Sequence, residues 1–295
     1  MVTAPATINA PLISTAWLAQ HLGDEQVVVL EVDEEPARYY EAHVPQALPV
    51  DYLDDLHHPV GRDLVDPAGL AALLGGFGIT AKTHIVLLGD AHNTYASFAY
   101  WMLHYYRHRH LSLLDGGKAA WLREGRPTTT DIAEPTPTRY PLPTPDETIR
   151  ATRDDILARF VDQPPGTALI DCRTEPEFRG RDARGVDLPV DRHRVPGHVP
   201  GARNLNSLDL LDPVTERFRP VEDLRQMFAA RDVSAELEVA MYCRLAERSS
   251  LLWFALHELL DHQRARNYDG GWAEYGSLIG APVTRLGESA TKTDG

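Results

Sequence analysis

The sequence predicts an α/β protein of two tandem domains, each with a mainly parallel sheet covered by helices on both faces. Three observations lead to this fold class. The chain has 295 residues, about twice the usual length of one domain. The same succession of motifs occurs twice, and within each copy short aliphatic runs alternate with amphipathic segments. Hydrophobic residues make up 43% of the chain and charged residues 24%, a balance that allows two buried cores.

The repeat is clearest in segments that recur in the same order. The run THIVLLGD, ending at Asp90, matches EVAMYC, ending at Cys243, and the apolar stretches that follow them match as well. Further on, LSLLDGG around Asp115 matches ARNYDGG around Asp269. An internal repeat decides the architecture, so we interpret the chain as a tandem duplication. The second copy carries an additional charged, proline-containing segment at Gly180–Pro196.

Each copy supplies three short aliphatic runs that we predict to be buried strands. Pro67–Leu74 and Val221–Ala229 have helical spacing of apolar residues and are predicted as helices between them. Strands separated by helices pair in parallel, and ligand sites in such sheets lie at the carboxyl ends of the strands. The predicted strands are Val27–Leu30, Ile85–Leu88 and Leu111–Leu114 in the first copy, and Ala168–Ile170, Val239–Tyr242 and Ala265–Tyr268 in the second.

A proline-rich segment between the copies sets the expected domain boundaries. Residues 131–148 contain five prolines between Pro135 and Pro145. Proline removes an amide donor and fixes φ, so we predict an extended, semi-rigid linker. We therefore expect an N-terminal domain over residues 1–130, a C-terminal domain over 149–286, and a flexible polar tail over 287–295.

Charge and cysteine content exclude several classes of function. The formal charge is −14 at pH 7, from 43 acidic and 29 basic residues, and this excess disfavours nucleic acids and anionic membranes as partners. No apolar run approaches the roughly 20 residues that span a bilayer, and the N-terminus does not resemble a secretory signal. The only two cysteines, Cys172 and Cys243, support neither a disulfide framework nor a four-cysteine zinc site. We expect a cytoplasmic protein that acts on small molecules.

Cys243 is the side chain best placed for chemistry. It follows a predicted strand and lies on a short loop before a strongly apolar helix. The N–H groups of a helix N-terminus favour negative charge, and Arg244 and Arg248 add positive charge that Glu247 partly opposes. Such surroundings lower the pKa of a cysteine from about 8.5 to between about 3.5 and 7.5 and produce a nucleophilic thiolate. The alternative is a small buried residue at a strand end, but the flanking arginines favour the reactive interpretation.

Two enzyme classes use a loop of this kind. Phosphatases of the Cys-x5-Arg type place five residues between the nucleophile and the phosphate-binding arginine. Here four residues separate Cys243 from Arg248, and Ser249 stands at the next position. The smaller ring suits one extra sulfur atom on the thiolate better than a tetrahedral phosphate. The spacing therefore favours sulfur transfer.

From Tyr242 to Val283 the sequence resembles the active-site half of a thiosulfate sulfurtransferase of the tandem-domain rhodanese family. It is most similar to the actinobacterial type, through the runs CRLAERSS and NYDGGWAEYG, and the likeness extends over nearly the whole chain. The resemblance implies two rhodanese domains, the first catalytically silent because Asp90 replaces the loop cysteine. It also implies a persulfide on Cys243 that takes the sulfane sulfur of thiosulfate and gives it to cyanide or another thiophilic acceptor, such as a thiol protein. No metal or organic cofactor is needed.

Two positions depart from the family pattern. Ala246 stands where the family's loop has glycine, and alanine with a positive φ is disfavoured by about 1 kcal/mol or more. Pro200 stands where mammalian-type members can place a basic substrate contact. With Cys243 as the catalytic residue, the expected substrate-binding residues are Arg244, Leu245, Ala246, Glu247, Arg248, Ser249, Arg173 and Trp272.

Several of these residues have structural alternatives. Arg173 either reaches the cleft or pairs with Glu175 or Glu177, and Trp272 is more often a packing residue than a substrate contact. Cys172 is expected to be structural, although a reversible disulfide with Cys243 is conceivable. A histidine group is expected to form a solvated, partly cationic face rather than a metal site, because arginines interleave it and no HExxH pattern exists. Its members are His57, His58, His104, His108 and His110.

Other functions stay open at this point. One is a 3-mercaptopyruvate sulfurtransferase, although that family usually has glycine where Arg244 stands. Another is a non-catalytic persulfide or redox carrier whose turnover Ala246 has reduced, and a third is a structural paralogue without activity. The sequence does not disclose the physiological donor and acceptor, the oligomeric state or the use of the Gly180–Pro196 insertion.

Overall fold

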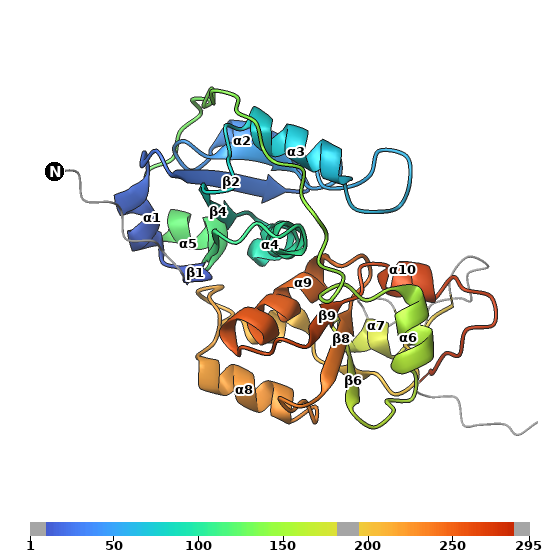
Figure 1. Cartoon of the computed structure of the whole chain (residues 1–295). Helices are drawn as coiled ribbons and strands as arrows, with labels where there is room; N and C mark the ends of the chain where they lie inside the picture. Colours follow the sequence, from blue (N-terminus) through green and yellow to red (C-terminus); the bar gives the residue numbers. More distant parts are fainter. Residues whose placement is uncertain (1–9, 182–194, 286–295) are drawn as a thin grey trace, which may run out of the picture. The chain divides into compact units, whose positions relative to one another are not determined.

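The computed structural model describes residues 10–181 and 195–285, and the chain divides into two compact units (Figure 1). The first unit runs to Asp146 and also takes in Leu211–Phe218. The second runs from Glu147 to Leu210 and resumes at Arg219. Most of the expected insertion, residues 182–194, and the expected tail lie outside the described residues.

The first unit contains a five-stranded, fully parallel sheet in the order β1-β5-β4-β2-β3. Helices cover both of its faces, which is why β4 is buried along its whole length. On one face Val29 and Val86 belong to a core that includes side chains of α1, α2 and α5. The strands are β1 (Leu12–Ile13), β2 (Val27–Asp33), β3 (Leu48–Asp51), β4 (His84–Leu88) and β5 (Leu111–Leu114).

The helices of the first unit begin at recognisable caps. The Ser14 side chain accepts a hydrogen bond from Trp17 N, and Asp66 caps α3 through Gly69 N, with Pro67 at the first helical position. A short 3-10 turn (Ala91–Asn93) leads into α4. The helices are α1 (Thr15–His21), α2 (Ala37–Glu41), α3 (Pro67–Gly76), α4 (Thr94–Tyr105) and α5 (Gly117–Arg123).

The second unit contains a four-stranded parallel sheet in the order β7-β6-β8-β9. Its strands are β6 (Thr167–Asp171), β7 (Arg203–Asn204), β8 (Glu238–Tyr242) and β9 (Ala265–Asn267). Its helices are α6 (Arg153–Arg159), α7 (Glu175–Phe178), α8 (Val221–Ala229), α9 (Glu247–Phe254) and α10 (Gly271–Tyr275), with a 3-10 turn at Ser207–Leu210 and a π turn at Ala255–Leu259 after α9.

One face of this sheet carries an aromatic core. Phe160 just after α6, Phe178 of α7 and Trp272 of α10 pack there against Leu169 and Tyr242 of the sheet.

The predicted fold class is confirmed, since both sheets are parallel and helices surround them (Figure 1). The six predicted strands are present, five of them inside β2, β4, β5, β6 and β8, while the run at Ala265–Tyr268 ends one residue earlier, in β9. The two predicted helices are α3, which extends to Gly76, and α8.

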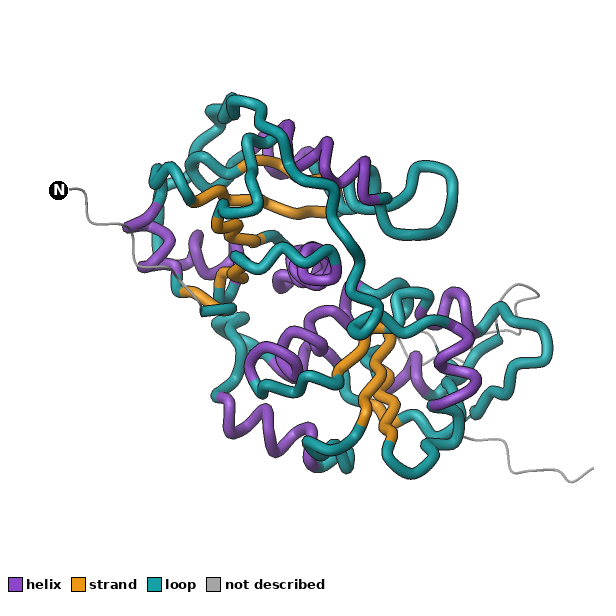
Figure 2. The backbone as a smooth tube through the Cα atoms, viewed as in Figure 1, coloured by secondary structure: helices purple, strands orange, loops and turns teal. Residues whose placement is uncertain are grey.

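The proline-rich stretch at residues 131–146 forms no helix or strand, and Figure 2 shows it as loop. It packs on the first unit. Thr138 N donates to Gly75 O at 2.8 Å, and Thr138 Oγ1 donates to Ile79 O at 3.0 Å. A side chain on Gly75 would meet Thr138 O, so this glycine permits the close approach.

The expectation for the histidines is wrong at His108. This side chain is buried, its Nδ1 lies 2.8 Å from Tyr140 Oη and its Nε2 lies 2.9 Å from Thr83 O. Burial lowers the pKa of His108 to about 4, so the ring is neutral and belongs to the core. His104 instead lies against the Arg109 guanidinium.

Among the described residues, no helix is both long enough and apolar enough to cross a membrane.

The parallel sheets bring chemically active side chains to one edge in each unit. Asp171 is opposite Tyr242 in the pairing of β6 with β8, so Cys172 and Cys243 leave the sheet side by side. In the first unit Asp33 ends β2, and Asp90 follows the neighbouring strand β4. Each unit therefore places a loop at the carboxyl end of its central strands, and these loops are the natural site positions.

Candidate functional site

The candidate site is the loop Cys243–Ala246, which we call the Cys243 loop, between β8 and α9. It turns back on its first residue. Ala246 N donates a hydrogen bond to Cys243 Sγ at 3.2 Å, and backbone donors of Leu245 and Ser249 also favour the thiolate. The sulfur therefore lies where N–H groups at the start of α9 converge, as the sequence predicted.

The predicted lowering of the Cys243 pKa is wrong. The side chain is completely buried, and burial raises the pKa of the thiol, as does the negative charge of Glu247. The positive charge of Arg248 and the backbone donors act in the opposite direction but do not prevail. Sequence reasoning counted the charges next to Cys243 and could not count the loss of water around the sulfur.

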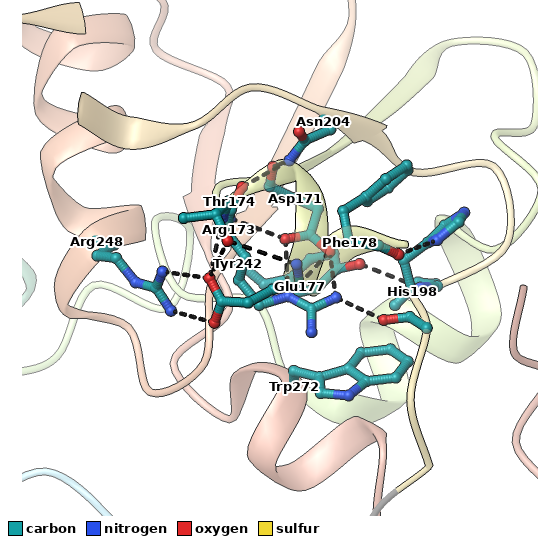
Figure 3. A network of polar contacts seen from close by, with 12 residues as sticks. Asp171, Arg173, Thr174, Glu177, Phe178, His198, Asn204, Tyr242, Arg248 and Trp272 are labelled. Carbon is teal, nitrogen blue, oxygen red and sulfur yellow. Dashed lines mark hydrogen bonds and ion pairs between the residues drawn. The ribbon is translucent and has the colours of Figure 1, made fainter. Parts of the chain in front are cut away.

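Arg248 is engaged by a carboxylate from another part of the unit. Its two terminal nitrogens donate to Glu177 of α7 at 2.8 and 3.1 Å (Figure 3). Glu177 also caps α7, accepting from Thr174 N at 3.0 Å and from Thr174 Oγ1 at 2.8 Å. Burial opposes the charge on Glu177, but Arg248 and Thr174 together hold its pKa at about 2. The pair fixes the first turn of α9 to α7.

Arg244 and Leu245, the middle residues of the loop, are exposed, while the loop backbone beneath them is held by the start of α10. Trp272 N donates to Cys243 O at 2.8 Å and Ala273 N donates to Arg244 O at 3.1 Å. Gly271 makes this possible, because a side chain there would lie 2.5 Å from Arg244 O and its φ is +56°. The second glycine of the DGGW motif thus allows α10 to approach the Cys243 loop.

Ala246 has φ of 93° and ψ of −22°, so it takes the left-handed conformation that favours glycine. The backbone strain that the sequence suggested at Ala246 is therefore present in the structure. Hydrogen bonds to the Ala246 carbonyl oxygen offset part of this strain. Ser250 N donates to it at 2.8 Å, and the hydroxyls of Ser249 and Ser250 lie 3.0 and 2.9 Å away.

Ser249 faces inward, where it contacts a residue that the sequence reasoning missed. Ser249 Oγ donates to Asn267 Oδ1 at 2.6 Å, and Asn267 Nδ2 donates to Ser250 Oγ at 2.9 Å. All three side chains are buried. Asn267 ends β9, so it ties the start of α9 to the sheet. Its place at the carboxyl end of a predicted strand was the signal that would have identified it.

Glu247 is the first residue of α9, and its carboxylate lies close enough to the Cys243 thiol for the two groups to influence each other's ionisation. Burial raises the pKa of Glu247. Among the described residues, its Oε2 atom is one of a few buried side-chain oxygens without a hydrogen-bond partner.

Arg173 pairs with neither of the glutamates expected from the sequence. Its guanidinium binds Asp171, with Nη2–Oδ2 at 2.6 Å and Nε–Oδ1 at 3.0 Å, and Nη2 also donates to Gly197 O (Figure 3). The Trp272 ring covers it, with 4.6 Å between Arg173 Cζ and the ring centroid. Both Arg173 and Trp272 are buried, and Trp272 Nε1 donates to Val195 O at 3.1 Å. Together with Asp171 they form a buried support beneath the site.

Cys172 is buried and lies close enough to Cys243 for the two thiols to influence each other's ionisation. Burial raises the pKa of Cys172 well above its ordinary value, and the neighbouring Cys243 and Asp171 raise it further. Both cysteines are free thiols in the structure. Cys172 therefore has the inert, buried character expected of a structural cysteine.

The equivalent loop of the first unit, Asp90–Asn93, is called here the Asp90 loop. Asp90 N donates to Asp33 Oδ1 at 2.7 Å, and Gly89 N donates to Asn93 Oδ1 at 3.0 Å. Beneath it lies a buried ion pair between Lys118 and Glu31. Side chains of the unit thus occupy the donors that would otherwise face a ligand.

Comparison with protein families gives one match that covers most of the chain. The family model described as rhodanese-like domain matches residues 14–124 and again residues 152–278. The two matched segments correspond to the two sheets.

Curated relatives match over nearly their whole length. The sulfur carrier protein TtuD of Thermus thermophilus is 38% identical over 275 residues, which is 93% of this chain and 96% of the relative. A Mycobacterium tuberculosis protein named "Putative thiosulfate sulfurtransferase" is 39% identical over 272 residues, with 92% and 96% covered. 

Solved structures share the fold at lower identity. An EanB variant in complex with ergothioneine superimposes with a TM-score of 0.82 at 21% identity, covering 93% of this chain and 70% of that one. The anaerobic ergothioneine biosynthesis enzyme of Chlorobium limicola gives a TM-score of 0.80 at 20% identity, with the same coverage.

Proposed function

Because this chain belongs to the rhodanese family of sulfurtransferases, we propose that it moves the sulfane sulfur of thiosulfate to a thiophilic acceptor through a persulfide on Cys243. The observation that carries the proposal is the position of the sulfur. Cys243 Sγ lies at the start of α9 and accepts a hydrogen bond from Ala246 N. The same donors favour the negative charge of a thiolate or of a persulfide anion.

The arginines of the site have separate roles in this proposal. Arg248 is bound to Glu177 and keeps the helix start in place. Arg244 is exposed on the loop and provides the charge that meets the sulfonate of thiosulfate. This division also favours thiosulfate over 3-mercaptopyruvate, whose known enzymes usually have glycine at the position of Arg244. A guanidinium binds two sulfonate oxygens at once, a geometry that suits this donor.

Cys243 is buried while its neighbours Arg244 and Leu245 are exposed. We therefore propose that these two side chains move aside to admit thiosulfate. The thiolate then attacks the sulfane sulfur, a new S–S bond forms, and sulfite leaves with the electron pair of the broken bond. A second substrate, cyanide or a thiol, removes the outer sulfur and regenerates Cys243.

The test is a pair of measurements on the full chain. The protein is incubated with thiosulfate, its mass is examined for the gain of one sulfur atom, and thiocyanate formation from cyanide is then assayed. Wild type should gain the sulfur and turn over, Cys243→Ser should do neither, and Cys172→Ser should retain both. Turnover that survives in Cys243→Ser would refute the proposal.

A second function, that of a sulfur carrier, is favoured by three specific observations. Ala246 is strained and the thiol pKa is raised, and both slow a catalytic cycle without preventing storage of sulfur. A relative 38% identical to this chain is named a sulfur carrier protein. In that case wild type gains one sulfur atom from a donor but gives thiocyanate only in a single turnover.

A further inference from the structure

The contact between Glu247 and Cys243 has a chemical consequence for the proposed sulfur transfer. Two facts set it apart from the other charged contacts of the site. The carboxylate lies close enough to the reacting thiol for the two groups to influence each other's ionisation, and its Oε2 atom is buried without a hydrogen-bond partner. A carboxylate within hydrogen-bond reach of a nucleophile is placed to receive its proton.

We propose that Glu247 accepts the proton of the Cys243 thiol when the sulfur attacks thiosulfate, and returns it when the persulfide is discharged. This inference rests on the proposed function, and it makes Glu247 a catalytic residue rather than a substrate-binding one.

Protons and electrons balance in both halves of the proposed reaction. The Sγ–H bond of Cys243 breaks, its proton moves to a carboxylate oxygen of Glu247, and the sulfur electron pair forms the bond to the sulfane sulfur. The S–S bond of thiosulfate breaks and its electron pair leaves with sulfite. In the second half, the acceptor attacks the outer sulfur of the persulfide. Sγ keeps the pair of the broken bond and takes the proton back from Glu247.

The charges around the carboxylate explain why a base is needed here. Burial raises the pKa values of both Cys243 and Glu247, so the resting thiol is protonated and the carboxyl is a stronger base than usual. Arg248 is 3.9 Å from Glu247, but its nearer partner is Glu177. Thiosulfate brings two negative charges, and a thiolate beside an ionised Glu247 would repel them. Moving the proton within the pair avoids this accumulation of charge.

The other ionisable groups near the pair are Arg244 on the loop and Cys172 at the end of β6. Arg244 lowers the pKa of Glu247 by its charge, after burial and Arg248. Cys172 is fully buried with a strongly raised pKa and remains a neutral thiol. Neither group accepts a proton from Cys243 at neutral pH, which leaves Glu247 as the acceptor among the described residues around the sulfur.

The test follows persulfide formation in the full chain by rapid mixing with thiosulfate and mass spectrometry, between about pH 5 and 9. Glu247→Gln keeps the shape of the side chain but cannot take a proton. We expect it to slow persulfide formation about 100-fold or more at neutral pH. Its rate should then rise with hydroxide over a range where the wild-type rate is level. Glu247→Asp should recover part of the rate, and the matched control Glu222→Gln, on the exposed start of α8, should behave as wild type.

Alkylation of the thiol by iodoacetamide, measured across the same pH range, separates a base from a structural residue. Removing the negative charge in Glu247→Gln should lower the pKa of Cys243 while persulfide formation slows, and loss of structure alone does not give these opposite effects. A Glu247→Gln protein that forms persulfide as fast as wild type overturns the inference, and so does a slower one with an unchanged pH profile. If wild type itself forms no persulfide, the proposed function is refuted, and this inference is refuted with it.

Discussion

The Cys243 loop and the Asp90 loop follow equivalent strands in the two units, yet their backbones are stabilised in opposite ways. In the Cys243 loop only Ala246 has a positive φ, and the loop N–H groups face the sulfur. In the Asp90 loop three consecutive residues, Ala91, His92 and Asn93, have φ values of 48°, 60° and 60°. There, Asp33 accepts a hydrogen bond from Asp90 N, and Asn93 accepts one from Gly89 N just before the loop.

The comparison shows that the same repeated turn can either bind a sulfur atom or be closed by side chains of its own unit. A turn at the carboxyl end of parallel strands collects backbone donors in either unit. In the second unit the Cys243 sulfur accepts a hydrogen bond from Ala246 N. In the first unit the Asp33 carboxylate binds Asp90 N, and the Asn93 side-chain oxygen binds Gly89 N. We therefore propose that the first unit contributes no persulfide.

The largest effect is expected at the buried ion pairs beneath the two loops. Asp171–Arg173 has side-chain exposures of 0% and 5%, and Glu31–Lys118 has 0% and 6%. Removing one partner leaves a buried charge alone and costs about 3–5 kcal/mol. Asp171→Asn and Glu31→Gln should each lower the unfolding free energy by about this amount in urea titrations. A loss below about 1 kcal/mol in either unit would mean that its pair is not a support of the loop.

A smaller effect is expected on acidification, which should change the stability contributions of Glu177 and Asp33 in opposite directions. The pKa of Glu177 is held at about 2, below its ordinary 4.5, so its stabilising contribution is complete above pH 4.5 and is lost as the pH falls toward about 2. Burial raises the pKa of Asp33, so the folded first unit binds a proton more tightly and gains stability as the pH falls from neutral.

Urea unfolding at pH 7 and pH 3 tests this contrast. Glu177→Gln should cost about 2 kcal/mol at pH 7 and much less at pH 3. Asp33→Asn keeps the acceptor for Asp90 N and should cost little at pH 7, because it removes a buried charge. A Glu177→Gln protein whose loss is independent of pH would show that the ion pair with Arg248 is not its source.

Relief of backbone strain gives the next effect. Ala246→Gly and Ala91→Gly both replace a residue with positive φ, and each should raise the unfolding free energy by about 0.5–1 kcal/mol. Only Ala246→Gly should change the rate of persulfide formation. An equal change of rate in both variants would mean that the Asp90 loop takes part in the reaction.

The smallest effect is expected from restoring a thiol in the first unit. Asp90→Cys, made together with Cys243→Ser, should give no sulfur transfer. The amides of Asp90 and Gly89 are already bound by Asp33 and Asn93, so we expect the new thiol to lack the donors that Cys243 has. Thiocyanate formation by this double variant would show that a cysteine alone was missing from the first unit.

Much of the fold could be predicted from the sequence, because short apolar runs indicate the central strands and recurring motifs indicate the duplication. The runs at Ile85–Leu88 and Val239–Tyr242 are buried central strands, as their uniform aliphatic character indicated. The Cys243 loop was also identifiable, because its residues are adjacent in the chain.

The features that could not be predicted depend on burial and on contacts between residues that are distant in the chain. Arg248 meets Glu177 and Ser249 meets Asn267 only after folding, so no local pattern gave these contacts. Glu177 forms a capping box with the nearby Thr174, but its contact with Arg248 depends on the folded unit. The predicted direction of the Cys243 pKa shift was wrong for the same reason, since removal of water from a side chain is a property of the folded unit.

The most direct test of sulfur transfer at Cys243 is to find which cysteine carries sulfur after brief exposure to thiosulfate. Peptide mapping by mass spectrometry distinguishes Cys172 from Cys243, because the two residues are far apart in the sequence and fall in different peptides. We predict one additional sulfur on the Cys243 peptide, in wild type and in Cys172→Ser. Sulfur found on the Cys172 peptide instead, or an active protein with no sulfur on either, would contradict this account.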